Sequence, residues 1–176
     1  MSDKEKLLST EEIFLGRAVN LRIDTIEKKS GVVTTREIVE HADCIAVVAV
    51  DDEGRIVMVK QFRTPINKSL LEIPAGGMQD GEDPEDCVRR ELQEETGYLP
   101  GKLQKLGGFY AAPGYCTEYL HLFLATHLTE SRLTAEDTDE IEVVRFTVPE
   151  IRAMIDSGEI CDAKSIAGLL KYLGSR

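Results

Sequence analysis

The sequence predicts an α/β fold of the α+β kind, in which α-helices flank a mixed β-sheet. Strand-like runs outnumber helical runs, and the two kinds of run do not alternate along the chain. Two β-branched runs flank a turn, which predicts an antiparallel pair. A chain of 176 residues, 42% of them hydrophobic, has the length and composition of one ordinary domain with a core.

The N-terminal residues predict an antiparallel strand region. Residues 1–12 predict a loose or helical start. The runs Phe14–Ile26 and Gly31–Glu40 predict two strands around the turn Lys28–Gly31. We therefore expect residues 1–42 to form a separate strand region.

The main domain is expected at residues 43–176, and it begins with a β-hairpin. Cys44–Val50 and Arg55–Lys60 are rich in β-branched residues, and Asp51–Gly54 between them is a strong turn signal. Further strands are predicted at Leu103–Tyr110, Tyr119–His127 and Ile141–Thr147. No repeat or Pro/Gly-rich linker divides the sequence.

Three helices carry recognisable start and stop signals. Asp83 suits the cap of the first helix, Pro84 its first position, and Gly97 the position after its end. Gly158 would stop the second helix, and Asp162 would cap the third. The predicted helices are Pro84–Thr96, Pro149–Ser157 and about Ala163–Leu173.

Charge and cysteine usage exclude several classes of function. The chain has 21 basic and 32 acidic residues and a formal net charge of −11. Such a surface repels nucleic acid and anionic membrane, so we expect neither as a partner. The cysteines form no CxxC pair, which argues against a zinc site or a disulfide framework. The polar start and the lack of a long apolar run predict a cytoplasmic protein.

The first predicted helix is the most informative segment. Glu91, Glu94 and Glu95 stand at positions i, i+3 and i+4, within an arc of roughly 100°. Carboxylates that close repel each other, and hard divalent cations with oxygen ligands would remove the repulsion. Glu91 and Glu95 lie beside the apolar stripe of the helix, which predicts their partial burial. Arg90 would offset part of the charge, and the plain alternative is a solvated acidic helix.

The run from Gly76 to Tyr98 resembles the Nudix box. It reads Gly76, five residues, Glu82, seven residues, Arg90-Glu91-Leu92, one residue, Glu94-Glu95, one residue, Gly97-Tyr98. Every defined position matches except the last, where the family has a bulky aliphatic residue instead of Tyr98. The resemblance implies the Nudix fold, with a mixed β-sheet sandwiched between α-helices. It also implies hydrolysis of a nucleoside diphosphate linked to another moiety.

The resemblance implies roles within and before the box. The implied ligands of magnesium or manganese are the carboxylates of Glu91, Glu94 and Glu95 and the carbonyl of Ala75. Arg90 would orient the glutamates, and Glu82 would support the geometry between loop and helix. Ahead of the helix, Leu71–Gly77 predicts a strand followed by a glycine-rich loop.

Residues outside the box resemble the ADP-ribose pyrophosphatase subgroup. Pro113 stands fifteen residues after Tyr98 and is followed by Gly114 and Glu118, as in that subgroup. Leu71–Gly76, Arg36–His41 and Gln61–Arg63 resemble the subgroup as well. The resemblance implies that ADP-ribose is split into AMP and ribose 5-phosphate, although Pro113-Gly114 alone would also suit a plain turn.

The substrate-binding residues are expected among a few arginines and apolar side chains. Arg36 and Arg63 suit the diphosphate and the terminal ribose, because a guanidinium pairs bidentately with phosphate oxygens. Either arginine could instead form a surface ion pair. Phe14, Phe62 and Met78 are candidates for stacking on adenine, with core packing the expected role of Phe14.

The subgroup's catalytic base lies on a loop after the box, which here is Thr134–Glu142. Relatives have glutamate where this chain has Asp137 or Asp139, so these two are the candidates. Aspartate is one methylene shorter, so Glu136 or Glu140 could substitute. The alternative is a simply solvated acidic loop.

Other functions remain open from the sequence. The same chemistry could act on another nucleotide sugar or, because Tyr115 lies seventeen residues past the box, on a diadenosine polyphosphate. A Nudix-fold binding or sensor domain without turnover is a rival of a different class. The subgroup resemblance also implies a homodimer that exchanges N-terminal strands.

Overall fold

The computed structural model describes residues 5–135 and 140–175, which group into two compact units. The first unit lies within Met1–Ala42 and Tyr110–Tyr119, and the second within Asp43–Phe109 and Leu120–Arg176. The Tyr110–Tyr119 segment thus groups with the N-terminal strands, although it lies inside the predicted main domain. The division into domains at residue 42 stays a prediction.

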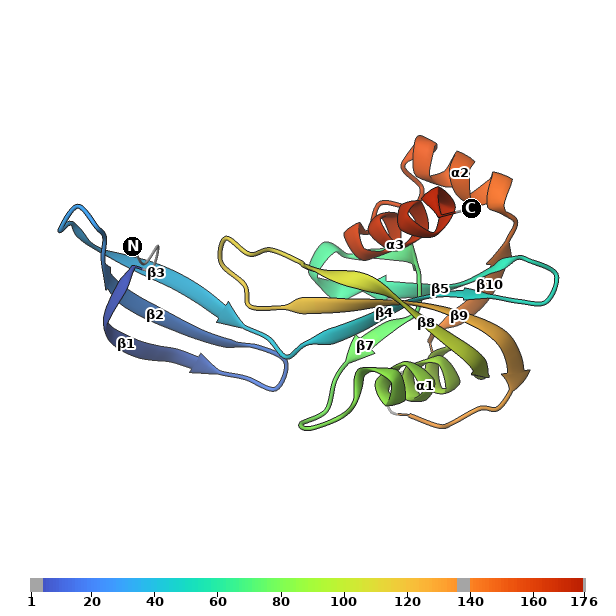
Figure 1. The fold of residues 1–176 in the computed structure, drawn as a ribbon, viewed down its shortest axis with the longest axis horizontal. Coiled ribbons are helices and arrows are strands. Elements are labelled where there is room, and N and C mark those ends of the chain that lie inside the picture. The colour runs from blue at the N-terminus through green and yellow to red at the C-terminus, as the bar shows by residue number, and fades with distance from the viewer. Residues whose placement is uncertain (1–4, 136–139, 176) are drawn as a thin grey trace. The chain divides into compact units, whose positions relative to one another are not determined.

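The first unit is an antiparallel sheet in the order β1-β2-β3 (Figure 1). Its strands are β1 (Lys6–Leu15), β2 (Asn20–Glu27) and β3 (Val33–Glu40). The predicted loose or helical start was wrong for residues 6–12, which belong to β1, where Thr10 Oγ1 donates across the strands to Asp24 Oδ1 at 2.8 Å. Residues 1–4 of that prediction lie outside the described residues. Phe14–Ile26 is two strands rather than one, since the chain turns where the Gly16 amide donates to the Val19 carbonyl.

The second unit is built on a seven-stranded sheet. Its strands are β4 (Cys44–Val50), β5 (Ile56–Arg63), β6 (Lys68–Glu72), β7 (Ala75–Gly77), β8 (Tyr98–Tyr110), β9 (Tyr119–Glu130) and β10 (Glu142–Phe146). The main path runs β10-β5-β4-β9-β8, with β6 on β5 and β7 on β4. β4 and β9 are parallel, whereas β5 pairs antiparallel with β4, β6 and β10. The predicted mixed sheet is confirmed.

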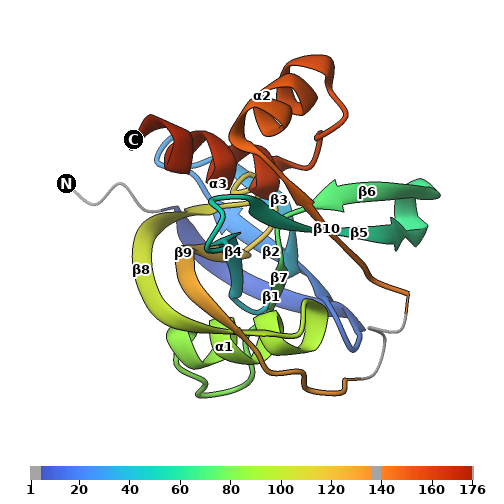
Figure 2. The ribbon, with the colours of Figure 1, turned by 90° about the vertical axis from the view of Figure 1, so that its right-hand side faces the viewer.

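Helices cover both faces of this sheet. They are α1 (Pro84–Glu95), α2 (Val148–Ser157) and α3 (Ala163–Gly174). Figures 1 and 2 show α1 on one face and the other two helices on the opposite face. Successive residues of β4 face opposite sides of the sheet. Val47 packs with α1, and Val48 packs with Leu169 of α3. Burial of β4 on both faces explains its continuous apolar sequence.

The structure contains the predicted signals at the N-termini of α1 and α3 and at the C-terminus of α2. Asp83 accepts a hydrogen bond from the Glu85 amide at 2.9 Å, and Asp162 accepts one from the Ser165 amide at 3.0 Å. Gly158 ends α2 with a φ of 80°, which a residue with a side chain rarely adopts. These caps account for helix bounds within one residue of those predicted.

The glycine-rich segment before α1 is a strand rather than the predicted loop. Ala75–Gly77 forms β7 because its backbone pairs with β4, from Cys44 opposite Gly77 to Ala46 opposite Ala75. A short 3₁₀ helix, η1 (Thr64–Ile66), joins β5 to β6. Among residues 5–135 and 140–175, no helix is long and apolar enough to cross a membrane. All four cysteines lie in this described part of the chain, and none of them forms a disulfide.

Candidate active site

The core packing of α1 determines where its glutamates face. The buried stripe of the helix consists of Cys87, Val88 and Leu92. With this stripe in the core, Glu95 is only 8% exposed. The side chains of Glu91 and Glu94 are 12% and 17% exposed. The predicted partial burial of Glu91 and Glu95 is confirmed.

Strand β7 lies directly against two of these carboxylates. The Ala75 amide donates to Glu95 Oε2 at 3.1 Å. A Cβ atom added to Gly76 would lie 2.0 Å from Cδ of Glu91, so glycine is what allows this carboxylate to approach the strand. The glycine is therefore required by the site and not by a turn.

Arg90 ties the loop before α1 to the carboxylates of the helix. Its Nε and Nη2 donate to Glu82 at 2.8 and 2.9 Å, and its Nη1 donates to Glu91 at 2.6 Å and to Glu94 at 3.2 Å. Nη2 also donates to the Gly77 carbonyl at 3.0 Å. The hydrogen bond from Arg90 lowers the pKa of Glu82 to about 2. One guanidinium thus contacts three carboxylates, and the roles that the resemblance implies for Arg90 and Glu82 stay predictions.

The electrostatic balance of the site is negative. Burial raises the pKa of Glu91, and Arg90 offsets this only in part. Burial and the neighbouring charge of Glu91 raise the pKa of Glu95 to about 8, although the Ala75 amide opposes the shift. Titratable groups with strongly shifted pKa values are typical of functional sites.

The donor atoms suit a hard divalent cation. Carboxylate oxygens are the ligands that magnesium and manganese prefer, and here those of Glu91 and Glu95 lie against one short strand, with Glu94 on the same helix face. A cation at Glu91, Glu94 and Glu95 would supply the positive charge that Arg90 alone does not. The residues present therefore fit such an ion.

Arg63 lies in the same unit and binds a second buried carboxylate. Its Nε and Nη2 donate to Glu72 at 2.7 and 2.6 Å. Lys164 of α3 also binds Glu72, and it contacts Asp162 at 3.0 Å. Nε and Nη2 are occupied, so Nη1 is the part of Arg63 left to reach a phosphate. The substrate role of Arg63 stays a prediction.

Sequence reasoning assigned no role to Glu72 or Lys164. The signal for Glu72 was present, because a carboxylate that interrupts the apolar run Leu70–Ile73 must have a partner when it is buried. Its side chain is 1% exposed. Lys164 had no such signal, since its contact with Glu72 joins residues 92 positions apart.

Three of the predicted substrate-binding residues meet in the first unit. Arg36, Pro113 and Gly114 line one cavity of about 250 Å³. Arg36 also donates to Glu5 at 2.9 Å. Glu118 lies near this segment, and its carbonyl accepts from the Ala111 amide at 3.1 Å. The structure thus groups Arg36 with Pro113 and Gly114, and the substrate roles of these residues and of Glu118 stay predictions.

The remaining predicted residues are dispersed. Met78 is half-buried in the second unit, where its amide donates to the Asp43 carbonyl. Phe14 was expected in the core, but it lies on β1 and is 56% exposed, so that expectation was wrong. The candidate bases Asp137 and Asp139 lie outside the described residues.

The chain is similar to proteins of a known family. A family model described as the NUDIX domain matches residues 40–169. An ADP-ribose pyrophosphatase of Bacillus subtilis (strain 168) is 41% identical over 97% of this chain and 92% of its own length. A methanol dehydrogenase activator of Bacillus methanolicus is also 41% identical, with the same coverage of both chains.

A solved structure supports the fold. It is described as the crystal structure of an ADP compounds hydrolase and superposes with a TM-score of 0.89, at 18% identity, over 97% of this chain and 93% of its own. At that identity the likeness concerns the fold alone. The family model covers most of the chain, and the relatives cover nearly all of it. By these matches, and as its box predicted, this chain belongs to the Nudix family.

Proposed function

We propose that this protein is a metal-dependent pyrophosphohydrolase that splits ADP-ribose into AMP and ribose 5-phosphate. The observation that carries the proposal is the cluster of Glu91, Glu94 and Glu95, in which Arg90 binds the first two carboxylates and the Ala75 amide of β7 binds the third. The Bacillus subtilis relative, 41% identical over nearly the whole chain, carries that activity in its name. The subgroup features at Arg36, Pro113 and Gly114 point to the same substrate.

Hydrolases of this family generally need a divalent metal, and we propose magnesium or manganese here. The carboxylates of Glu91, Glu94 and Glu95 and the carbonyl of Ala75 would hold it. When bound, the metal would neutralise the diphosphate charge and polarise the scissile bond.

The side chains of the protein would do the remaining work. Arg90 keeps Glu91 and Glu94 in fixed orientations, so little reorganisation would be needed when substrate binds. Arg36 and Arg63 would bind phosphate and ribose oxygens. A carboxylate of the loop, Asp137 or Asp139, would take the proton from the attacking water.

We further propose a cytoplasmic homodimer that acts on a small nucleoside diphosphate and binds neither nucleic acid nor membrane. Cysteines that form no disulfide within the described residues suit a reducing compartment. The net charge of −11 disfavours polyanionic partners. Exposed apolar side chains on β1 support association through the N-terminal strands.

The test is an assay of purified protein with magnesium and a panel of substrates. The panel contains ADP-ribose, other ADP- and GDP-sugars, and diadenosine polyphosphates, and the nucleotide products are separated by chromatography. We expect AMP and ribose 5-phosphate from ADP-ribose at the highest kcat/KM. Preference for another member of the panel would overturn the substrate assignment, and no product from any member would overturn the hydrolase.

A pair of variants on α1 tests the site itself. E95Q removes a buried carboxylate beside β7 and should lower kcat by at least about a hundredfold while the fold is kept. E85Q is the matched control, because Glu85 is exposed on the same helix and pairs with Arg89. Full activity in E95Q would refute the role of Glu95.

A further inference from the structure

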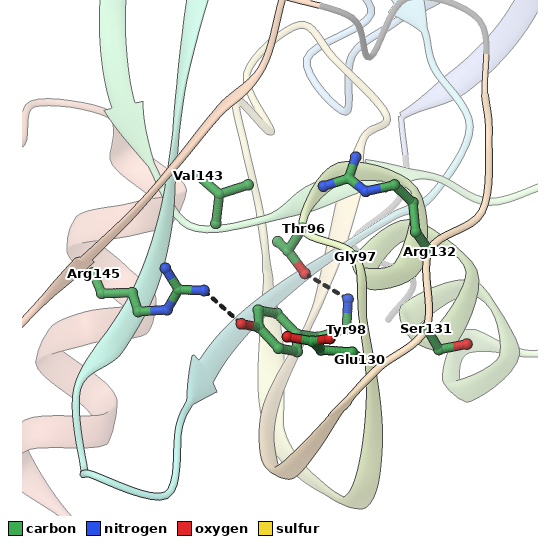
Figure 3. Close-up of a pocket in the computed structure, with 8 residues that line it drawn as sticks. All are labelled: Thr96, Gly97, Tyr98, Glu130, Ser131, Arg132, Val143 and Arg145. Carbon is green, nitrogen blue, oxygen red and sulfur yellow. Dashed lines mark hydrogen bonds between the residues drawn. The ribbon is translucent and has the colours of Figure 1, made fainter.

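A cavity of about 480 Å³ lies where α1 ends in the second unit (Figure 3). Its walls come from the start of β8, the end of β9 with the residues after it, and β10. The lining residues that matter are Gly97, Tyr98, Glu130, Ser131, Arg132 and Arg145. None of them belongs to the predicted metal or substrate residues. We call this space the arginine cavity.

Tyr98 is the position at which this chain departs from the Nudix box. Its hydroxyl accepts a hydrogen bond from Arg145 Nη2 at 2.5 Å. The guanidinium carbon of Arg145 also lies 5.5 Å from the centre of the tyrosine ring. An aliphatic residue would offer neither contact. The departure therefore gives the cavity a polar wall and holds one guanidinium at that wall.

The lining of this cavity has a positive net charge, whereas the molecule as a whole is negative. Two arginines face one glutamate, Glu130, so the lining carries a net charge of +1 in a chain of −11. Within the described residues, neither Arg132 nor Arg145 forms an ion pair, whereas Arg63 and Arg90 each bind a carboxylate. In Figure 3 the two guanidinium groups extend toward each other from opposite walls.

Hydroxyl donors complete the lining. Gln93 Nε2 donates to Ser131 Oγ at 2.9 Å, which leaves the hydroxyl proton of Ser131 to donate. The Tyr98 hydroxyl likewise accepts a hydrogen bond from Arg145, so it can donate a hydrogen bond to a ligand. Gly97 has a φ of 79°, and an added Cβ would lie 3.1 Å from Arg132 Nη2, so the missing side chain leaves room for that guanidinium.

We propose that the arginine cavity binds a phosphomonoester. Two guanidinium groups and two hydroxyls supply more donors than a carboxylate can use, and they match a dianion with three terminal oxygens. The volume falls within the range of small-molecule sites and would accept a nucleoside monophosphate. AMP and ribose 5-phosphate are the natural occupants, an identity that rests on the proposed function. The preference for phosphate does not rest on it.

Isothermal titration calorimetry in metal-free buffer with a chelator tests this site apart from the carboxylate cluster, which repels phosphate when no cation is bound. The probes are inorganic phosphate, AMP and ribose 5-phosphate. We expect saturable binding of at least one probe to the wild type. R132Q and R145Q should each weaken it by about tenfold or more, because each removes a charged hydrogen-bond donor.

Two further variants separate a binding site from a structural contact. E130Q removes the opposing charge and should strengthen binding by several-fold, which loss of a structural role would not do. R152Q on α2 is the matched control, because Arg152 is exposed and lies outside the cavity, and it should bind as the wild type does. Circular dichroism verifies the fold of each variant.

The possible outcomes are distinct. No binding of any probe, or equal binding by wild type, R132Q and R145Q, overturns the proposal. Binding that is weaker in R132Q and stronger in E130Q supports it even if R145Q fails to fold. The measurement needs neither metal nor turnover, so a protein that binds phosphate here but does not hydrolyse ADP-ribose would refute only the proposed function.

Discussion

Gly76 decides how closely the Glu91 carboxylate approaches β7. In G76A the added Cβ would lie 2.0 Å from Cδ of Glu91, and the carboxylate would have to move by an ångström or more. We expect kcat for ADP-ribose to fall by about a hundredfold, because a misplacement of about 1 Å costs that much. Steady-state kinetics at saturating magnesium measures this effect.

The neighbouring glycine supplies the control for this experiment. A Cβ added to Gly77 meets no heavy atom within 4 Å, so G77A should keep a kcat close to that of the wild type. If G76A and G77A lose activity equally, the loss does not come from the close approach of Glu91 to Gly76, because the strand then tolerates no side chain at either position. If G76A retains wild-type kcat, the close approach of Glu91 is not needed for catalysis.

Buried Glu72 should make the free energy of unfolding depend on pH in the acid range. Burial alone would raise its pKa, but hydrogen bonds from Arg63 and Lys164 hold that pKa below its ordinary value of 4.5. The stabilisation is therefore present above pH 4.5 and is lost as pH falls through the folded-state pKa. We expect the free energy of unfolding to fall with pH below 4.5, and to fall less steeply in E72Q.

At pH 7, E72Q leaves Arg63 and Lys164 without their carboxylate. We expect this variant to be less stable by about 2 kcal/mol, below the usual cost of breaking a fully buried pair, because Arg63 is partly exposed. Urea unfolding at several pH values measures both effects. E53Q, which alters an exposed ion pair with Arg55, should leave the stability and its pH dependence almost unchanged.

Helix α3 reaches the sheet through a glycine. A Cβ at Gly168 would lie 2.8 Å from Ile73 Cδ1 and 3.1 Å from Leu122 Cδ1, and both side chains are buried. Overpacking a core destabilises a protein by about 1–3 kcal/mol. Alanine is more favourable than glycine inside a helix by about 1 kcal/mol, which offsets part of that cost. We expect G168A to be less stable than the wild type by about 1 kcal/mol.

Urea midpoints with unchanged m-values test this packing. G174A is the control, because its added Cβ meets no heavy atom within 4 Å. G174A should be as stable as the wild type or slightly more stable. Stabilisation of G168A to the same degree as G174A would show that the contact of α3 with Ile73 is looser than the structure indicates.

The elements differ in how much of them the sequence could predict. Helix α1 was predictable because Asp83, Pro84 and Gly97 mark its ends by local backbone chemistry. β1 was not, because all of its residues are exposed and its pattern has no buried face. β7 was missed because two glycines carry no strand signal, and only pairing with β4 makes them a strand.

Long-range pairing also limits what could be predicted for the whole molecule. Tyr110–Tyr119 follows β8 in the chain, yet it groups with the N-terminal strands. Val39 links the two, since its amide donates to the Tyr115 carbonyl at 2.8 Å and its carbonyl accepts from the Thr117 amide at 3.0 Å. Backbone contacts of this kind depend on no side-chain pattern, so the sequence assigned the segment to the main domain.

The proposed dimer can be tested by measuring the mass of the protein in solution. Leu7, Phe14 and Leu15 on β1 are 56%, 56% and 66% exposed, which is unfavourable in water unless another surface covers them. We expect sedimentation equilibrium to give about twice the chain mass of 19.6 kDa, and the double variant F14D/L15D to give the mass of one chain. L170D alters an apolar residue of α3 that is 51% exposed, and it should remain dimeric. A monomeric wild type at micromolar concentration, or a double variant that stays dimeric, would show that β1 does not hold two chains together.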